Sequence, residues 1–178
     1  MENVHYETDT NYLQDFCDER GVPLHIITTS FTTSPEGSAS VQKPPCFLCS
    51  WQRRKQLFNL AQELGFTKIA LGHHQDDIIH TALMNLTFQG HFATMPAKLR
   101  MKKMPLTIIR PLCLCHEADI QAYADANHYE KQVKQCPYED TTNRTSATML
   151  FAHMEMLNPE ARYSIWHALE NANKLTEY

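Results

Sequence analysis

The sequence predicts an α/β domain with a parallel sheet, because short apolar runs alternate along the chain with segments of helical periodicity. The runs at 24–28, 67–72 and 106–110 are compact and contain β-branched side chains, which is typical of buried strands. A segment with helical spacing follows each of them. Three strands are few for such a fold, since a parallel sheet needs cover on both faces.

The helices are predicted from the spacing of apolar residues and from the residues that end them. Residues 11–20 form one amphipathic segment, and residues 46–64 form another that ends at Gly65. Between the elements, residues 29–45 and 91–105 are predicted to be loops. The remaining helices are expected from the HHQDD sequence to Gly90, at 116–127, at 143–157 and at 159–175.

The composition fits one globular domain but excludes several kinds of phosphate site. The chain has 178 residues, of which 43% are hydrophobic and 20% are charged, and this is enough apolar material for a sizeable core. It contains only five glycines, which are scattered along the sequence. Loops that need clustered glycines, such as GxGxxG and GxxxxGK[ST], are therefore excluded.

The chain contains no segment that predicts a membrane association. No window approaches about eighteen apolar residues, and the acidic start lacks the apolar run of a secretory signal. We therefore expect a cytoplasmic protein with no membrane partner. In that reducing compartment the six cysteines are expected to be thiols or metal ligands rather than disulfides.

The charges are distributed unevenly along the chain. Residues 1–42 carry one Arg against seven acids, residues 43–110 carry ten basic residues against three acids, and residues 111–178 carry five against ten. A cationic middle between two acidic ends favours a localised surface for binding anions. The alternative, that these basic side chains only cover solvated helix faces, remains open on charge alone.

A Cys-x-x-Cys pair, Cys46 and Cys49, stands at the predicted start of a helix and is followed by Arg53 and Arg54. The helix N-terminus and the basic residues stabilise thiolates, and this spacing lets two thiolates share a metal or cluster or form a redox disulfide. The alternative is that both are small buried hydrophobic residues.

One Cys-x-x-Cys supplies only two ligands, so any metal site needs more. Cys136 is a candidate because it stands at an element boundary before Pro137. Cys113 and Cys115 would alternate between faces of an extended segment, which favours core packing. Three thiolates suit an iron–sulfur cluster with one open iron, and four would suit zinc.

A second polar group follows the predicted strand at 67–72. It contains two imidazoles and two carboxylates directly after a glycine: Gly72, His73, His74, Asp76 and Asp77. Ligands of open α/β sheets bind beyond the carboxyl ends of the strands, where these groups could hold Mg²⁺ and a polyphosphate. The alternative makes the two aspartates ordinary acidic residues of a helix's first turn.

Five motifs occur in order in this chain: P-C-x-L-C-S-x-x-R-R at 45–54, T-K-I-A-L-G-H-H-x-D-D-I at 67–78, M-P-A-K-L at 95–99, I-R-P-L at 109–112 and D-I-Q-x-x-A-D at 119–125. Together they resemble the tRNA 2-thiocytidine biosynthesis proteins of the PP-loop ATPase superfamily. The resemblance implies an adenine nucleotide alpha-hydrolase-like, Rossmann-like fold. It also implies an ATP-dependent tRNA thiolase, in which ATP adenylates the 2-oxygen of an anticodon-loop cytidine before sulfur replaces it.

The resemblance assigns roles to the matching residues. Cys46, Cys49 and Cys136 would hold a [4Fe–4S] cluster that carries sulfur to the base, although C-P-Y-E at the last ligand departs from the family's second pair. The implied partners are tRNA and a sulfur donor such as a cysteine desulfurase. The nucleotide and Mg²⁺ side would comprise Gly72, His73, His74, Asp76 and Asp77. The residues expected to face tRNA phosphates are Arg53, Arg54, Lys98, Arg100, Lys102 and Lys103.

The family begins with a strand and an S-G-G-x-D-S phosphate loop, then a helix and a second strand, and this chain matches none of them. Its strands match the third to fifth of the family sheet, and the two missing strands would separate the run at 24–28 from the others. We therefore expect the C-terminal portion of such an enzyme, with residues 1–142 as a partial PP-loop domain and 143–178 as a helical extension. Weak ATP binding and no thiolation are expected unless a partner supplies the missing segment; a homodimer is also allowed.

Other functions stay under consideration. A non-catalytic metal- or RNA-binding remnant of the same family would keep the cysteines but lack ATP chemistry. Lysidine synthetases lack the Cys-x-x-Cys, and archaeal-type uridine thiolases carry flanking paired-cysteine zinc modules, so this sequence matches neither pattern.

Overall fold

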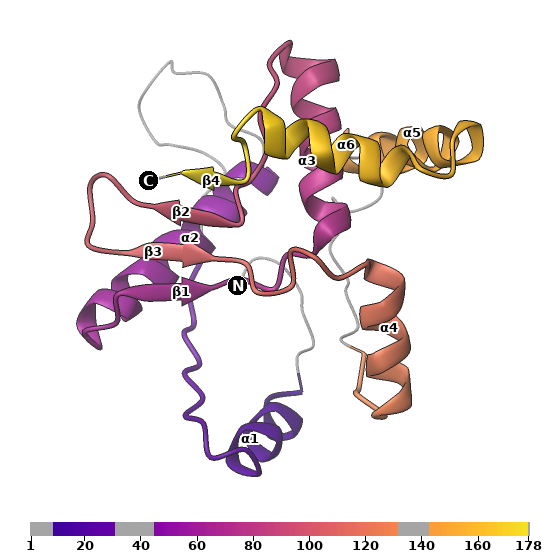
Figure 1. The fold of residues 1–178 in the computed structure, drawn as a ribbon. Coiled ribbons are helices and arrows are strands. Elements are labelled where there is room, and N and C mark those ends of the chain that lie inside the picture. Colours follow the sequence, from indigo (N-terminus) through magenta and orange to yellow (C-terminus); the bar gives the residue numbers. More distant parts are fainter. Residues whose placement is uncertain (1–8, 31–44, 132–142, 178) are drawn as a thin grey trace. The chain divides into compact units, whose positions relative to one another are not determined.

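The computed structural model describes residues 9–30, 45–131 and 143–177, which form two compact units (Figure 1). The first unit contains the described residues up to Leu60 together with Glu130 and Lys131, and the second contains the rest. The helices are α1 (Thr10–Asp18), α2 (Pro45–Glu63), α3 (Gln75–Gln89), α4 (Glu117–Ala126), α5 (Asn143–Leu157) and α6 (Ala161–Asn171). The strands are β1 (Lys68–Ala70), β2 (Lys98–Arg100), β3 (Thr107–Ile109) and β4 (Thr176–Glu177).

The four strands form one sheet in the order β1-β3-β2-β4. β1 pairs in parallel with β3 and β2 with β4, whereas β2 and β3 are antiparallel. Ile69, Ile108 and Leu99 lie side by side in this register and point to the same face. The predicted α/β class, with a sheet dominated by parallel pairs and flanked by helices, is confirmed.

The strand predicted at 24–28 is wrong. Residues 22–30 contain neither strand nor helix, and Ile26 and Ile27 are 60% and 43% exposed. A β-branched run becomes a strand only when a neighbour completes its hydrogen-bond ladder. None of the described strands lies next to this segment in the sheet, so its composition alone does not make it a strand.

Two short strands were not predicted. β2 lies inside the predicted loop 91–105, and β4 follows the last helix. Three residues are too few for a periodic pattern, and the partners of β4 are 78 positions earlier in the chain. The approach to β4 is fixed by a backbone bond from Ala97 N–H to the Leu175 carbonyl at 2.7 Å.

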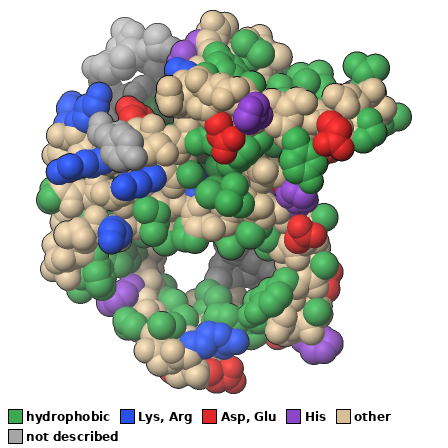
Figure 2. Space-filling model, viewed as in Figure 1, with side chains coloured by type: hydrophobic (Ala, Val, Ile, Leu, Met, Phe, Trp, Pro, Cys, Tyr) green, Lys and Arg blue, Asp and Glu red, His purple; other side chains and the backbone are tan. Residues whose placement is uncertain are grey.

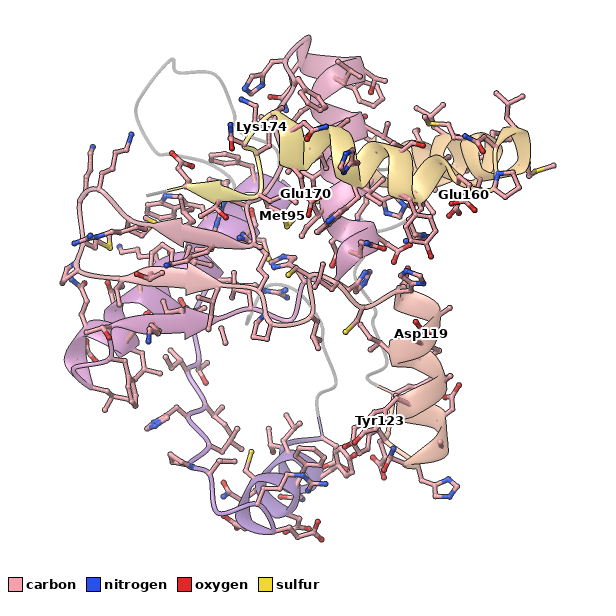
Figure 3. All side chains as sticks on the ribbon, viewed as in Figure 1. Met95, Asp119, Tyr123, Glu160, Glu170 and Lys174 are labelled. Carbon is pink, nitrogen blue, oxygen red and sulfur yellow. The ribbon has the colours of Figure 1, made fainter. Side chains whose placement is uncertain are left out.

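α3 is the centre of the second unit, because it is buried on two sides. Ile78 and Ile79 are fully buried next to each other in its first turns. One cluster joins Ile79 to Phe151 of α5, and another joins Ile78 to Leu169 of α6. Figure 3 shows Met95 between the strands and α6, where it packs on the second cluster. The last two helices therefore complete the core around the start of α3.

Helix ends at two of the predicted glycines are confirmed. Gly65 follows α2 with φ 71°, and Gly90 caps α3 with φ 65°. This left-handed conformation is costly for residues with a Cβ, which explains glycine at both positions. The predicted division at residue 142 stays a prediction. Across the described ranges, none of the helices combines the length and the apolar character needed to cross a membrane.

Candidate functional site

The carboxyl ends of β1 and β3 bring two of the sequence motifs together. The two strands are parallel neighbours, and the Leu71 N–H extends their ladder by donating to the Ile109 carbonyl at 2.9 Å. The loop Gly72–His74 that leads into α3 and the residue Arg110 after β3 therefore lie at the same edge of the sheet. This is the edge where open α/β sheets bind ligands.

Three buried nitrogen atoms at this edge have no hydrogen-bond partner among the described residues: His73 Nδ1, His74 Nδ1 and Arg110 Nε. A buried polar atom left unpaired costs about 1–3 kcal/mol, so natural proteins rarely retain one without a reason. Three such atoms at the ends of two adjacent strands make this edge the candidate ligand site. The His74 ring also lies near both aspartates, with Nδ1 3.7 Å from Asp76 Oδ2 and Nε2 3.4 Å from Asp77 Oδ2.

The electrostatics of this edge suit an anion. Burial lowers the pKa of His73, and the charges of Arg110, Arg144 and His74 lower it further, so its imidazole is neutral at neutral pH. Burial also lowers the pKa of Arg110, but a guanidinium remains charged in proteins. One Arg110 nitrogen, Nη1, donates to the Pro96 carbonyl, which anchors the side chain and leaves Nε available.

Asp76 is engaged on both of its carboxylate oxygens. Oδ1 lies 2.8 Å from Nη2 of Arg162 on α6, and Oδ2 accepts from the backbone N–H of Glu117 at 2.9 Å, the first residue of α4. Burial raises the pKa of Asp76, but the bonds from Arg162 and Glu117 and the charge of Arg162 outweigh burial and lower it. Asp76 thus ties α3 to α4 and α6.

Asp77 is also engaged on both oxygens. Oδ2 accepts the backbone N–H of His74 at 3.0 Å, which caps the start of α3, and Oδ1 pairs with Arg144 of α5. Among the described residues, no three His, Cys, Asp or Glu side chains converge as a metal-binding group. The carboxylates therefore organise the loop in this structure, and their predicted nucleotide and Mg²⁺ roles remain predictions.

Gly72 stands at the mouth of this loop. It is exposed, its φ is not in the left-handed region, and an added Cβ would have no atom within 4 Å. Neither backbone conformation nor packing requires glycine here. A ligand that approaches the backbone closely would supply the missing reason.

The predicted thiol pair lies in the first turn of α2. Pro45 is the first helical residue, Cys46 is exposed, and Cys49 is half-buried one turn later on the same side. The first turn contains no acidic residue that would oppose a thiolate. Two accessible thiols with this spacing fit a metal or cluster. Cys136, the predicted third ligand, lies outside the described residues.

The other cysteines behave as packing residues. Cys113 is half-buried against the Ile78–Leu169 cluster, and burial raises the pKa of its thiol. Cys115 is half-buried, and its carbonyl accepts the Gln75 N–H at 3.0 Å. The expectation that Cys113 and Cys115 do not form one metal site stays a prediction.

The basic residues predicted to face tRNA fall into two groups. Arg53 and Arg54 lie on α2, where Arg54 Nε donates to the Ser50 carbonyl at 3.2 Å. The others lie on one strand and the turn after it: Lys98 and Arg100 on β2, and Lys102 and Lys103 in the connection to β3. Their role in binding RNA remains a prediction.

Three arginines were not assigned to the site from sequence. Arg110 directly follows a buried strand, so the rule that ligands bind at carboxyl ends could have identified it. Arg144 and Arg162 come from helices far along the chain and meet the motif only through tertiary packing. No local pattern predicts those two contacts.

The chain is similar in sequence to known proteins. Residues 4–149 match the family model of the PP-loop domain. Over 160 residues the chain is 36% identical to proteins named tRNA-cytidine(32) 2-sulfurtransferase from Pseudomonas syringae pv. syringae and from Pseudomonas putida strain W619. These matches cover 89% of this chain and 58% of each relative, so the chain spans little more than half their length.

A solved structure is also similar. The U34-tRNA thiolase NcsA from Methanococcus maripaludis, with its [4Fe-4S] cluster, matches with a TM-score of 0.71 and 25% identity. The match covers 94% of this chain and 57% of the thiolase.

Proposed function

Since this chain belongs to the PP-loop domain family, we propose that it takes part in ATP-dependent thiolation of tRNA, with a cytidine of the anticodon loop as the base that is modified. The observation that carries the proposal is an accessible Cys-x-x-Cys pair at a helix N-terminus in a chain with this domain. The names of the relatives and the cluster of the similar thiolase support sulfur transfer to tRNA as the reaction.

The thiols would act on the sulfur side of the reaction. Cys46 and Cys49 would bind two corners of an iron–sulfur cluster, and Cys136 would supply the third thiolate. When bound, such a cluster with one open iron carries sulfur that can be transferred to an activated base. The helix N-terminus of α2 would favour the negative charge of a thiolate-ligated cluster bound there.

The edge of the sheet would act on the nucleotide side. Arg110 and the neutral His73 would donate hydrogen bonds to phosphate oxygens, and Gly72 would let the nucleotide approach the backbone. The position of these groups beyond parallel strands supports this assignment. Asp77 is the candidate for Mg²⁺, whereas Asp76 holds the loop to α4 and α6.

The proposed setting is the cytoplasm, with a sulfur donor such as a cysteine desulfurase delivering sulfur. A partner that contributes to the nucleotide site, or a second copy of the chain, is also part of the proposal.

The experiment starts from the purified full chain, reconstituted anaerobically with iron and sulfide. We expect iron and sulfide to bind in the wild type and to be lost in Cys46→Ser, Cys49→Ser and Cys136→Ser. Cys17→Ser is the matched control, because this half-buried cysteine lies in α1 outside the proposed ligand set. Equal metal content in the Cys46→Ser variant and the control would contradict the cluster assignment.

Activity is then measured by mass spectrometry of nucleosides from tRNA after incubation with ATP and sulfide. The measurement is made on the chain alone and with a separately expressed N-terminal segment of a longer relative. Formation of 2-thiocytidine in either mixture, dependent on ATP and on Cys46, supports the proposed reaction. Cluster binding without any thiolation in both mixtures would favour a non-catalytic metal-binding protein.

A further inference from the structure

A cavity of about 410 Å³ lies on one face of the sheet of the second unit and extends along β3 from the residues before it to Ile109. It is bordered by the starts of β1 and β3 and by β2. The residues that line it are Thr67, Lys68, Lys98, Arg100, Pro105, Leu106, Thr107 and Ile109.

The charged side chains of this cavity are all cationic. Lys68, Thr107 and Arg100 are direct neighbours in the register across three strands, so two cations flank one hydroxyl. Neighbouring strands are about 4.8 Å apart, which places the two cationic strand positions about 10 Å from each other. Lys98 adds a third positive charge one pleat further along, and none of the lining residues is acidic.

The pleat explains why these residues share a face. Side chains alternate along each strand, so the row Lys68–Thr107–Arg100 lies opposite the apolar row Ile69–Ile108–Leu99. Lys68 and Arg100 are exposed, whereas Ile69 and Ile108 are only 6% exposed. Figure 2 shows several Lys and Arg side chains gathered on the side of the molecule where the strands lie.

This combination suits a phosphodiester better than a free nucleotide. The cations and the Thr107 hydroxyl are donors for phosphate oxygens, and Pro105 and Ile109 offer an apolar surface for a ribose or base. The nucleotide site proposed above is at the carboxyl ends of the strands, whereas this cavity reaches their starts. A polynucleotide can place a phosphodiester in this cavity while a nucleotide is bound at the carboxyl ends of the strands.

We propose that this cavity binds a phosphodiester of the RNA substrate. The inference rests on the proposed function, and it revises which basic residues are predicted to contact RNA phosphates. Lys98 and Arg100 belong to the cavity, and Lys68 is a new member. Lys102 and Lys103 are not among the residues that line it.

Binding of tRNA to the full chain, measured by fluorescence anisotropy between 0.05 and about 0.3 M salt, tests this assignment. The cavity variant is Lys68→Gln with Arg100→Gln, and the matched control is Lys102→Gln with Lys103→Gln, which removes the same charge nearby. Each phosphate contact that is lost should weaken binding about five- to tenfold at 0.1 M salt, so the cavity variant should lose about 25-fold or more. Its salt slope should decrease by about 2, while the control changes little.

Equal losses in the two variants would overturn the inference, since they would indicate a diffuse basic surface. An unchanged salt slope in the cavity variant would overturn it as well. If wild-type chain shows no tRNA binding, the proposed function fails together with the inference. If wild type binds and only the cavity comparison fails, the proposed function stands and this inference does not.

Lysine acetylation with mass spectrometry distinguishes the sources of the anion. We expect tRNA to protect Lys68 more strongly than Lys102, and neither ATP nor inorganic tripolyphosphate to do so. Protection of Lys68 by tripolyphosphate as strong as by tRNA would reassign the cavity to free phosphates. Protection by polyglutamate of equal charge concentration but not by tRNA would reassign it to an acidic protein.

Discussion

Arg162→Met is expected to destabilise the second unit strongly, because it leaves a buried carboxylate without its cation. The side chains of Arg162 and Asp76 are only 13% and 10% exposed, and their charged atoms are 2.8 Å apart. Breaking such a pair by removing one partner costs about 3–5 kcal/mol. The same side chain also donates to Glu155 at 3.0 Å and lies 4.9 Å from the centre of the Phe151 ring, so several contacts are lost together.

Urea unfolding followed by tryptophan fluorescence measures this loss. Trp51→Phe serves as the background, so that Trp166 on α6 is the only tryptophan left to report. Arg162→Lys should recover part of the loss, since it keeps the charge without the forked geometry. Adding Asp76→Asn to Arg162→Met should also recover part, because the stranded charge is removed.

The pH dependence of the unfolding free energy provides a second test, because the direction of the change can be predicted. The pKa of Asp76 is lower in the folded chain than in the unfolded chain. The stabilisation that the Asp76 carboxylate adds to the free energy of unfolding is therefore complete above the unfolded pKa near 3.8, and it is lost as the pH falls through the folded pKa. Wild type and Arg162→Met should therefore differ most at neutral pH and converge in acid. A loss below about 1 kcal/mol at neutral pH, or strictly additive effects of the Asp76 and Arg162 substitutions, would refute the reasoning.

Four further predictions concern single residues. Burial lowers the pKa of His80 below 6.5, so the His80 imidazole takes up a proton more readily in the unfolded chain than in the folded chain. The unfolding free energy should fall from about pH 7 to about pH 5, and His80→Gln should flatten this slope in pH-dependent urea titrations. Gly90→Ala should cost about 1–2 kcal/mol at φ 65°, whereas Gly72→Ala should leave the melting temperature unchanged but weaken ATP binding in calorimetry. Asp9→Ala should speed amide exchange in the first turn of α1 by removing a cap worth about 1 kcal/mol, because Asp9 accepts from Asn11 and Tyr12.

The parts of the fold that could be predicted depend on interactions within a few residues. α2 and α3 were predicted from apolar spacing and from glycines that adopt positive φ at their ends. Residues 24–28 contain apolar and β-branched side chains, as β1 does, but they form no strand, because a strand depends on a neighbour that composition does not encode.

The residues of the candidate site could likewise be predicted only where they are close together in the sequence. The Cys46–Cys49 pair and the loop after β1 were found because their residues are close in sequence. Arg162 contacts Asp76 only because α6 packs on α3, and nothing near either residue predicts that contact. The orphaned nitrogens of His73 and Arg110 likewise become visible only when β1 and β3 are paired.

The two aspartates of the loop differ in how easily they could release their partners to a metal ion. Arg162 is 13% exposed and has acceptors on three residues, so displacing it from Asp76 would leave a cation in the core. Arg144 is 59% exposed, and displacing it from Asp77 would let its guanidinium move into water at little cost. Mg²⁺ prefers carboxylate oxygens that it can reach with part of its water shell retained. We therefore expect Asp77 to exchange Arg144 for the metal, while Asp76 keeps its partners and holds the loop in place.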